Sequence, residues 1–173
     1  GAGATPSYIT DSAGNDLIDL NGTANTAADT ILSGSGADVI RSYGGNDFIG
    51  AGSGADVVTS GDGADSVVGG GGGDTIVAGN GNDTVVAGNG IDIITGGAGV
   101  DDLDGGADAD VFIVAGSDQV AGDKIAGGTG VNSIRLAGDA TANNAATVTA
   151  EFDFDNISDV LLLANSVVAG DLD

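Results

Sequence analysis

Aspartates recur along this chain at intervals of nine residues and are the side chains best placed to do chemistry. The ten that share this spacing are Asp29, Asp38, Asp47, Asp56, Asp65, Asp74, Asp83, Asp92, Asp101 and Asp110. A carboxylate can act as a general acid or base, or it can bind a hard cation such as calcium. Because the chain has no histidine and no cysteine, catalytic constellations built on those residues cannot form. A pair of carboxylates could still act as acid and base, but aspartates engaged by a cation are not free to do so. The other interpretations are cation binding and a simple turn role, since aspartate also hydrogen-bonds its own backbone in turns.

The residues around each aspartate repeat as well. The second residue after each one is large and apolar: Ile31, Ile40, Ile49, Val58, Val67, Ile76, Val85, Ile94, Leu103 and Phe112. The second residue before it is glycine in eight of ten cases: Gly36, Gly45, Gly54, Gly63, Gly72, Gly81, Gly90 and Gly99. The sequence therefore predicts a unit made of a glycine-rich turn, an aspartate and a three-residue strand.

A fixed short period predicts a solenoid, because a single repeat cannot bury its apolar residue and has to stack on copies of itself. Nine residues are too few for a helical repeat. Each glycine inside a helix would also cost about 1 kcal/mol relative to alanine. Parallel β-strands are the remaining choice.

The segments GGGGGDTIV, AGNGNDTVV and GGAGVDDLD resemble the G-G-x-G-x-D-x-U-x nonapeptide of RTX proteins, which form a calcium-binding parallel β-roll. The resemblance covers residues 29–113 without interruption and extends more weakly over 11–135. It implies an all-β fold, a right-handed parallel β-roll with calcium in its turns. We expect a linker and first degenerate rung in 1–28, the regular roll in 29–113, degenerate rungs in 114–135 and a C-terminal capping or β segment in 136–173.

In the family that this chain resembles, two nonapeptides make one turn of the roll, so alternate repeats stack along one edge. One edge would then hold Asp29, Asp47, Asp65, Asp83 and Asp101, and the other would hold Asp38, Asp56, Asp74, Asp92 and Asp110. Four gaps along each edge give about eight calcium ions, with more at degenerate rungs. Backbone carbonyls of the turns would complete each site, at Gly34, Gly36, Gly45, Gly52, Gly54, Gly61, Gly63, Gly70, Gly72, Gly79, Gly81, Gly88, Gly90, Gly97, Gly99 and Gly106. Curling these carbonyls toward one point requires positive φ, which glycine adopts without strain.

Three turns depart from the pattern. Tyr43 replaces the first of the two glycines, and Ala27 and Asp108 replace the second. A Cβ in the left-handed region costs about 1–2 kcal/mol. We expect these turns to bind calcium less tightly.

The charge balance points in the same direction. The net charge is −23 with three basic residues, and about eight calcium ions would bring it to roughly −7, an ordinary value for a soluble domain. Without calcium, carboxylates stacked about 4.8 Å apart would repel one another, so we expect the ion-free chain to be unfolded. Weak calcium modules of this kind fill outside the cell, which predicts a secreted, extracellular or cell-surface protein. Three cations supply no basic patch for nucleic acid or anionic membrane, and no apolar run is long enough for membrane insertion.

Composition favours a structural function. Alanine, glycine, threonine, valine and aspartate dominate, and cysteine and methionine are absent, which resembles bacterial S-layer proteins exported by a type I system. We therefore expect a non-enzymatic, calcium-binding structural domain that assembles into a lattice or contacts neighbouring domains. The alternative is a calcium-folded module of a type I-secreted toxin, protease, lipase or adhesin. An ice-binding roll is disfavoured, because the turns present no regular row of threonine and asparagine.

One face of the predicted roll is unusually apolar. The residues that would point outward from the even-numbered repeats are Val39, Val57, Thr75, Ile93 and Val111, beside Arg41, Thr59, Val77, Thr95 and Ile113. Contiguous apolar surface usually marks a contact, so we expect this apolar strip to be covered by the segment after Arg135 or by a neighbouring subunit. The competing interpretation is that valine and isoleucine are simply good strand formers.

Overall fold

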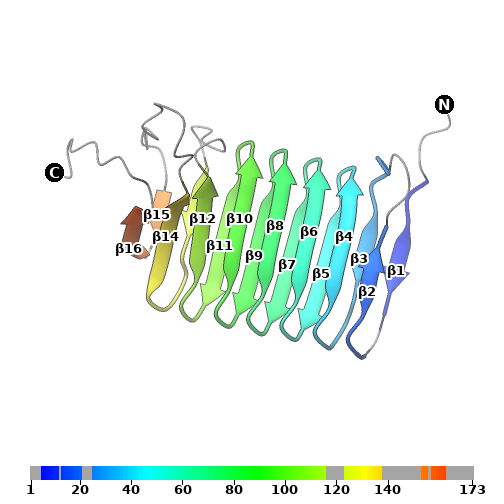
Figure 1. The fold of residues 1–173 in the computed structure, drawn as a ribbon, viewed down its shortest axis with the longest axis horizontal. Coiled ribbons are helices and arrows are strands. Elements are labelled where there is room, and N and C mark those ends of the chain that lie inside the picture. Colours follow the sequence, from blue (N-terminus) through cyan, green and yellow to red (C-terminus); the bar gives the residue numbers. More distant parts are fainter. Residues whose placement is uncertain are drawn as a thin grey trace.

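The computed structural model describes residues 5–11, 13–20, 25–115, 123–137, 153–155 and 157–162. In these ranges the chain is a β-solenoid of two parallel sheets and contains no helix. Each sheet has eight strands, one formed by the odd-numbered and one by the even-numbered strands (Figure 1). The expected all-β parallel fold is confirmed. The described ranges therefore contain no helix that is long and apolar enough to cross a membrane.

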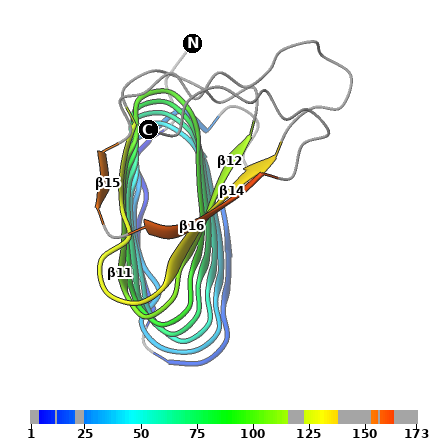
Figure 2. The ribbon, with the colours of Figure 1, turned by 90° about the vertical axis from the view of Figure 1, so that its left-hand side faces the viewer.

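The strands alternate between the two sheets in chain order. The odd sheet contains β1 (Tyr8–Thr10), β3 (Thr30–Leu32), β5 (Phe48–Ser53), β7 (Ser66–Gly71), β9 (Thr84–Asn89), β11 (Asp102–Ala107), β13 (Lys124–Ala126) and β15 (Asp153–Asp155). The even sheet contains β2 (Leu17–Asp19), β4 (Val39–Gly44), β6 (Val57–Asp62), β8 (Thr75–Asn80), β10 (Ile93–Ala98), β12 (Val111–Ala115), β14 (Asn132–Ala137) and β16 (Ile157–Leu162). Figure 2 shows the sheets end-on, enclosing a narrow interior.

The interior is filled by the apolar residue of each repeat. Ile49 pairs with Val67 and Val67 with Val85 along the odd sheet, and all of the predicted core residues from Ile31 to Phe112 are buried. The row continues beyond the regular repeats through Ile18, Ile125 and Ile134. Each residue therefore buries its side chain against the rungs on either side, as a stacked repeat requires.

The strands β4 to β11 are six residues long, so the prediction of three-residue strands was wrong. Pairing resumes after the core residue, for example at Gly52–Gly70 and Ser53–Gly71. The reason is that a glycine in one turn meets a glycine with the same backbone conformation in the turn two repeats later. The ladder of hydrogen bonds consequently runs on into the glycine-rich segment, which sequence patterning assigns to the turn.

The roll extends beyond the regular repeats at both ends. Strands β13 and β14 continue the two sheets after the longer step from Asp110 to Asp123. Strands β15 and β16 then pair with them in parallel, β16 with a register irregularity at Asn132/Ser133. The described part of the expected C-terminal capping segment is thus strand. The other residues after Ala137 lie outside the described residues.

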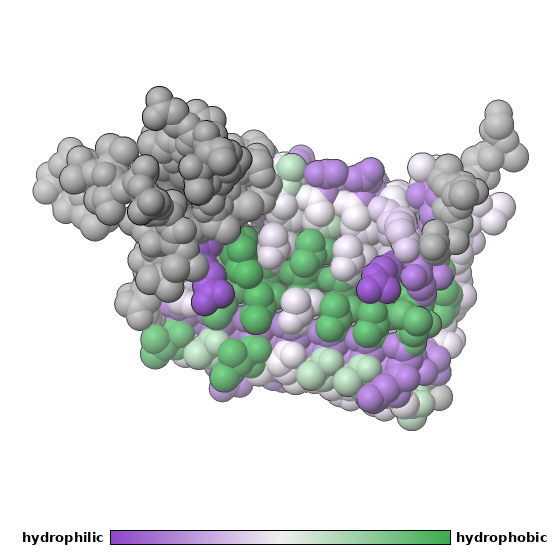
Figure 3. All heavy atoms as spheres, viewed as in Figure 1, coloured by the Kyte–Doolittle hydropathy of each residue, from purple (hydrophilic) through white to green (hydrophobic). Residues whose placement is uncertain are grey.

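The even sheet presents the apolar strip predicted from the sequence. Figure 3 shows this face with a band of apolar side chains along it. Val57, Val77 and Ile93 remain 43%, 37% and 39% exposed. Within the described ranges no segment covers them, because β14 and β16 extend the sheet sideways. The prediction of a covering segment after Arg135 falls mainly on residues outside those ranges.

Candidate metal centre

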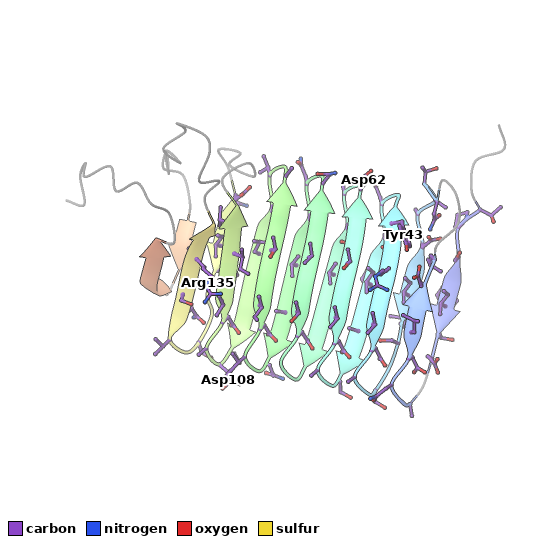
Figure 4. All side chains as sticks on the ribbon, in the orientation of Figure 1. Tyr43, Asp62, Asp108 and Arg135 are labelled. Carbon is purple, nitrogen blue, oxygen red and sulfur yellow. The ribbon has the colours of Figure 1, made fainter. Side chains whose placement is uncertain are left out.

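The ten aspartates lie at the turns, and hydrogen bonds join them into two rows. In the row called here the Asp29 edge, the amide of each aspartate donates to Oδ1 of the next: Asp29 to Asp47, Asp47 to Asp65, Asp65 to Asp83 and Asp83 to Asp101, at 2.8–2.9 Å. In the row called the Asp38 edge, Asp38 donates to Asp56, Asp56 to Asp74, Asp74 to Asp92 and Asp92 to Asp110, at 2.7–2.9 Å. Alternate repeats therefore stack in the two rows that the sequence resemblance implied. Figure 4 shows the two edges: Tyr43 and Asp62 lie at the Asp29 edge, and Asp108 lies at the Asp38 edge.

Each carboxylate in the middle of these rows uses one oxygen and leaves the other without a hydrogen-bond donor. The side chains are buried, with at most 3% of any of the ten residues exposed. The donorless Oδ2 atoms belong to Asp38, Asp47, Asp56, Asp65, Asp74, Asp83, Asp92 and Asp110. A buried polar atom without a partner costs about 1–3 kcal/mol, and more when it is charged. Such a penalty at these eight turns is the expected signature of atoms that bind a cation.

Burial makes the ionised form of these carboxylates unfavourable in the ion-free roll. Desolvation raises the pKa of Asp74, Asp83 and Asp110 from the ordinary value of 3.8 to about 6. A bonded amide of the preceding rung lowers each pKa, but by less than burial raises it. Neighbouring aspartates of the same edge raise the pKa further. A proton or a metal cation would relieve this unfavourable state.

The predicted glycines carry the backbone conformation that the turns need. Every one of them has positive φ, from 92° at Gly106 to 141° at Gly99. Space is a second reason for glycine: a Cβ on Gly70 would fall well inside 3.0 Å of the carbonyl oxygen of Gly52, and one on Gly72 would meet Gly54 in the same way. The turns therefore stack carbonyl against Cα hydrogen, which leaves no room for a side chain.

The three irregular turns solve this problem differently. Tyr43 and Asp108 adopt positive φ, at 77° and 85°, and so bear the strain that glycine avoids. Around Asp108 the stacking loosens, since the Gly90 amide lies 3.2 Å from the Ala107 carbonyl where the equivalent Gly72 bond is 2.8 Å. Ala27 avoids positive φ altogether. Its turn takes another backbone path.

Calcium fits this donor set. Among the described residues no three carboxylates lie close enough together to hold a metal ion by themselves, so a cation has to draw most of its oxygens from backbone carbonyls. Calcium accepts carboxylate and carbonyl oxygens alike and takes six to eight of them. The aspartates of the two edges would hold the ions with the turn carbonyls, and each ion would supply the positive charge that the buried Oδ2 atoms lack.

Residues outside the nine-residue spacing also enter the rows. Asp16 donates its amide to Asp38 Oδ1 at 2.9 Å, Asp101 to Asp123 Oδ1 at 2.9 Å and Asp110 to Asn132 Oδ1 at 2.8 Å. The signal was present in the sequence, because Asp16, Asp123 and Asn132 each precede an apolar residue by two. Asn25 was missed entirely. Its amide Nδ2 donates to Asp29 Oδ2 at 2.8 Å, and no repeat pattern predicts this contact.

Known protein families supply an independent comparison. A family model for the RTX calcium-binding nonapeptide repeat (4 copies) matches residues 23–58, 44–76, 59–94 and 77–112. Together these matches span the turns from Asn25 to Asp110. No curated protein and no solved structure matches the chain.

Proposed function

The chain belongs to the family of RTX calcium-binding nonapeptide repeats, and from this premise we propose that it is a structural domain whose folding depends on calcium. RTX repeats bind calcium, and proteins that contain them are generally secreted. The observation that carries the proposal is the row of buried Oδ2 atoms without donors. The net charge of −23 also indicates that the folded chain needs bound cations, since repulsion between its negative charges opposes compaction.

Binding and folding are then one event. The carboxylates of one edge come together only in the folded roll, so the unfolded chain has no preformed site. A ligand that binds only the folded state stabilises it by mass action. Calcium above its dissociation constant outside the cell would therefore fold the domain, whereas the low calcium of cytosol would leave it extended.

Circular dichroism tests this dependence directly. In buffer depleted of metal at pH 7.5 we expect a coil spectrum, and millimolar calcium should produce a cooperative change to β-structure. Magnesium at the same concentration is the matched control, because it requires near-octahedral geometry and dehydrates reluctantly. A chain with full β-structure in metal-free buffer and no response to calcium would contradict the proposal.

We propose further that the parent protein is a secreted bacterial surface-layer protein, exported by a type I system, and that this domain has no catalytic role. Support comes from the composition, with no cysteine, methionine or histidine, and from the aspartates, whose Oδ1 atoms are engaged by backbone amides. Carboxylates committed to the backbone and to a cation are not free to transfer protons. The exposed apolar strip of the even sheet is the candidate contact between copies.

A double substitution on the strip tests assembly. Val57→Lys with Ile93→Lys places two charges at exposed positions, so the roll should still fold in calcium while self-association measured by light scattering is lost. The matched control on the opposite face is Val68→Lys with Val86→Lys, at positions that are 38% and 39% exposed, and it should leave association unchanged. Unaltered association in the Val57/Ile93 variant would remove the strip as the lattice contact.

A further inference from the structure

At the Asp29 turn, a single side-chain nitrogen, that of Asn25, donates to both an aspartate oxygen and a carbonyl oxygen. Its Nδ2 donates to Asp29 Oδ2 at 2.8 Å and to the Ser42 carbonyl oxygen of the next turn along the same edge at 2.9 Å. Both partners are acceptors only, so the amide nitrogen is the atom that faces them. The amide oxygen Oδ1 faces the other way and accepts from the Ala27 amide at 3.3 Å.

The same pair of oxygens meets at the Asp74 turn without such a donor. At three other turns a serine hydroxyl donates its one proton to the carbonyl of the pair: Ser33 to Ala51, Ser42 to Ser60 and Ser60 to Ala78. Ser42 is the second residue after Ile40, the core residue of the repeat that follows Asp29. Ala87 is likewise the second residue after Val85, in the repeat that follows Asp74. A Cβ built on Gly69 would lie 2.6 Å from Asp74 Oδ2 and 2.5 Å from the Ala87 carbonyl oxygen, so these two oxygens converge as their counterparts do at Asn25. Asp74 Oδ2 has no hydrogen-bond donor. The two turns thus differ in what satisfies the carboxylate.

Asp29 is fully satisfied by the chain itself. The Ser7 amide donates to its Oδ1 and Asn25 to its Oδ2, although the residue is as buried as the other aspartates. Ala27, at the second position that is glycine in the regular turns, does not adopt positive φ, and its amide donates to Asn25 Oδ1. Both oxygens of this buried carboxylate therefore have a hydrogen-bond donor without a cation.

Resting on the proposed calcium function, we propose that the Asn25 amide takes the place of a cation between the Asp29 and Asp47 turns, so that this gap closes without calcium. The row of ions on the Asp29 edge then begins between Asp47 and Asp65. Of the eight gaps between the ten regularly spaced aspartates, seven would hold ions. Asn25 is a specificity-determining residue in this sense, because it decides which turn is metal-independent.

Ion positions in the unmodified protein give the direct test. Crystals grown in calcium should show an anomalous scattering peak between Asp47 and Asp65 and none between Asp29 and Asp47. A peak between Asp29 and Asp47, with Asn25 rotated to present Oδ1 as a ligand, would overturn the inference while leaving the proposed function intact. Crystals without any peak along either edge would instead refute the proposed function.

Variants test the same point in solution by counting bound calcium with native mass spectrometry. Asn25→Gly with Ala27→Gly restores both glycines of the repeat and should add one ion to the wild-type number. Thr26→Gly with Ala28→Gly is the matched control, because it adds two glycines to the same turn at the positions between, and it should add none. An unchanged number in the Asn25/Ala27 variant, with the fold retained by circular dichroism, would count against Asn25 as the residue that excludes calcium.

Discussion

The turns in the middle of the roll and the turns near its ends share one register and differ in their chemistry. Around Asp74 the turn has glycine with positive φ at Gly70 and Gly72, and a carboxylate oxygen without a donor. Near the ends, Asn25 supplies a donor to Asp29, and Asp108 adopts φ 85° beside a stretched 3.2 Å stacking bond. The strands therefore stack in the same register whether or not the buried carboxylate of a turn has a hydrogen-bond donor.

This difference has a physical origin. Register is set by the buried apolar residue and by backbone hydrogen bonds, which every rung repeats. Cation binding depends instead on a few oxygens in each turn, so a single side chain can cancel it. We expect the middle of the roll to depend on calcium more strongly than the rung at Asn25.

Proton binding should imitate calcium in the middle turns, and we expect this to be the largest effect. Burial raises the folded-state pKa of Asp74, Asp83 and Asp110 to about 6 from 3.8, so the ion-free fold binds protons more tightly than the unfolded chain does. Its stability is then greatest below about pH 4 and is lost as pH rises through about 6. Circular dichroism in metal-free buffer should show β-structure at pH 4.5 and coil at pH 7.5.

The triple variant Asp74→Asn, Asp83→Asn, Asp110→Asn is the control for this titration. Asparagine keeps an oxygen for the amide of the preceding rung and carries no charge to titrate. Its pH dependence in metal-free buffer should be smaller than that of the wild type. A variant with the same midpoint and amplitude as the wild type would show that these three carboxyls do not cause the transition.

A side chain in a middle turn should be costly wherever the turns stack. Gly70→Ala forces a Cβ onto the Gly52 carbonyl at φ 113°, and we expect it to lower the free energy of unfolding in calcium by about 2 kcal/mol or more. Its neighbour Gly71 has open space around its Cβ direction, so Gly71→Ala should change stability by less than about 0.5 kcal/mol. Chemical denaturation in calcium measures both. Equal losses would mean that stacking does not select glycine.

At the end turn the opposite change should be favourable, though smaller. Asp108→Gly removes the strain of a side chain at φ 85° and should stabilise the calcium-bound roll by about 1 kcal/mol. Asp62→Gly serves as the control, since Asp62 does not adopt positive φ and its Oδ1 accepts from Asn80 at the surface at 2.7 Å. We expect no gain there. A stabilisation of similar size in both variants would indicate a general effect of lost negative charge.

The sequence by itself determined the solenoid, the two rows of aspartates and the glycines of the turns. The nine-residue period fixes which residues can share a position, and the alternation of Asp74 with Ile76 or Asp83 with Val85 separates turn from core. These features are local and repeated, so each copy reinforces the others. The fold and the family inferred in this way are confirmed, whereas the bound ions and the lattice stay predictions.

Only the tertiary structure decided how far the strands run and which turn satisfies its own carboxylate. The strands extend through Gly52 because Gly70, two repeats further along the chain, pairs with it. The nine-residue pattern alone does not predict which turn residues pair with one another. Asn25 reaches the Ser42 carbonyl across a gap between rungs that exists only after stacking. Contacts between rungs depend on the path of each turn in space, and at this turn the path departs from the repeat.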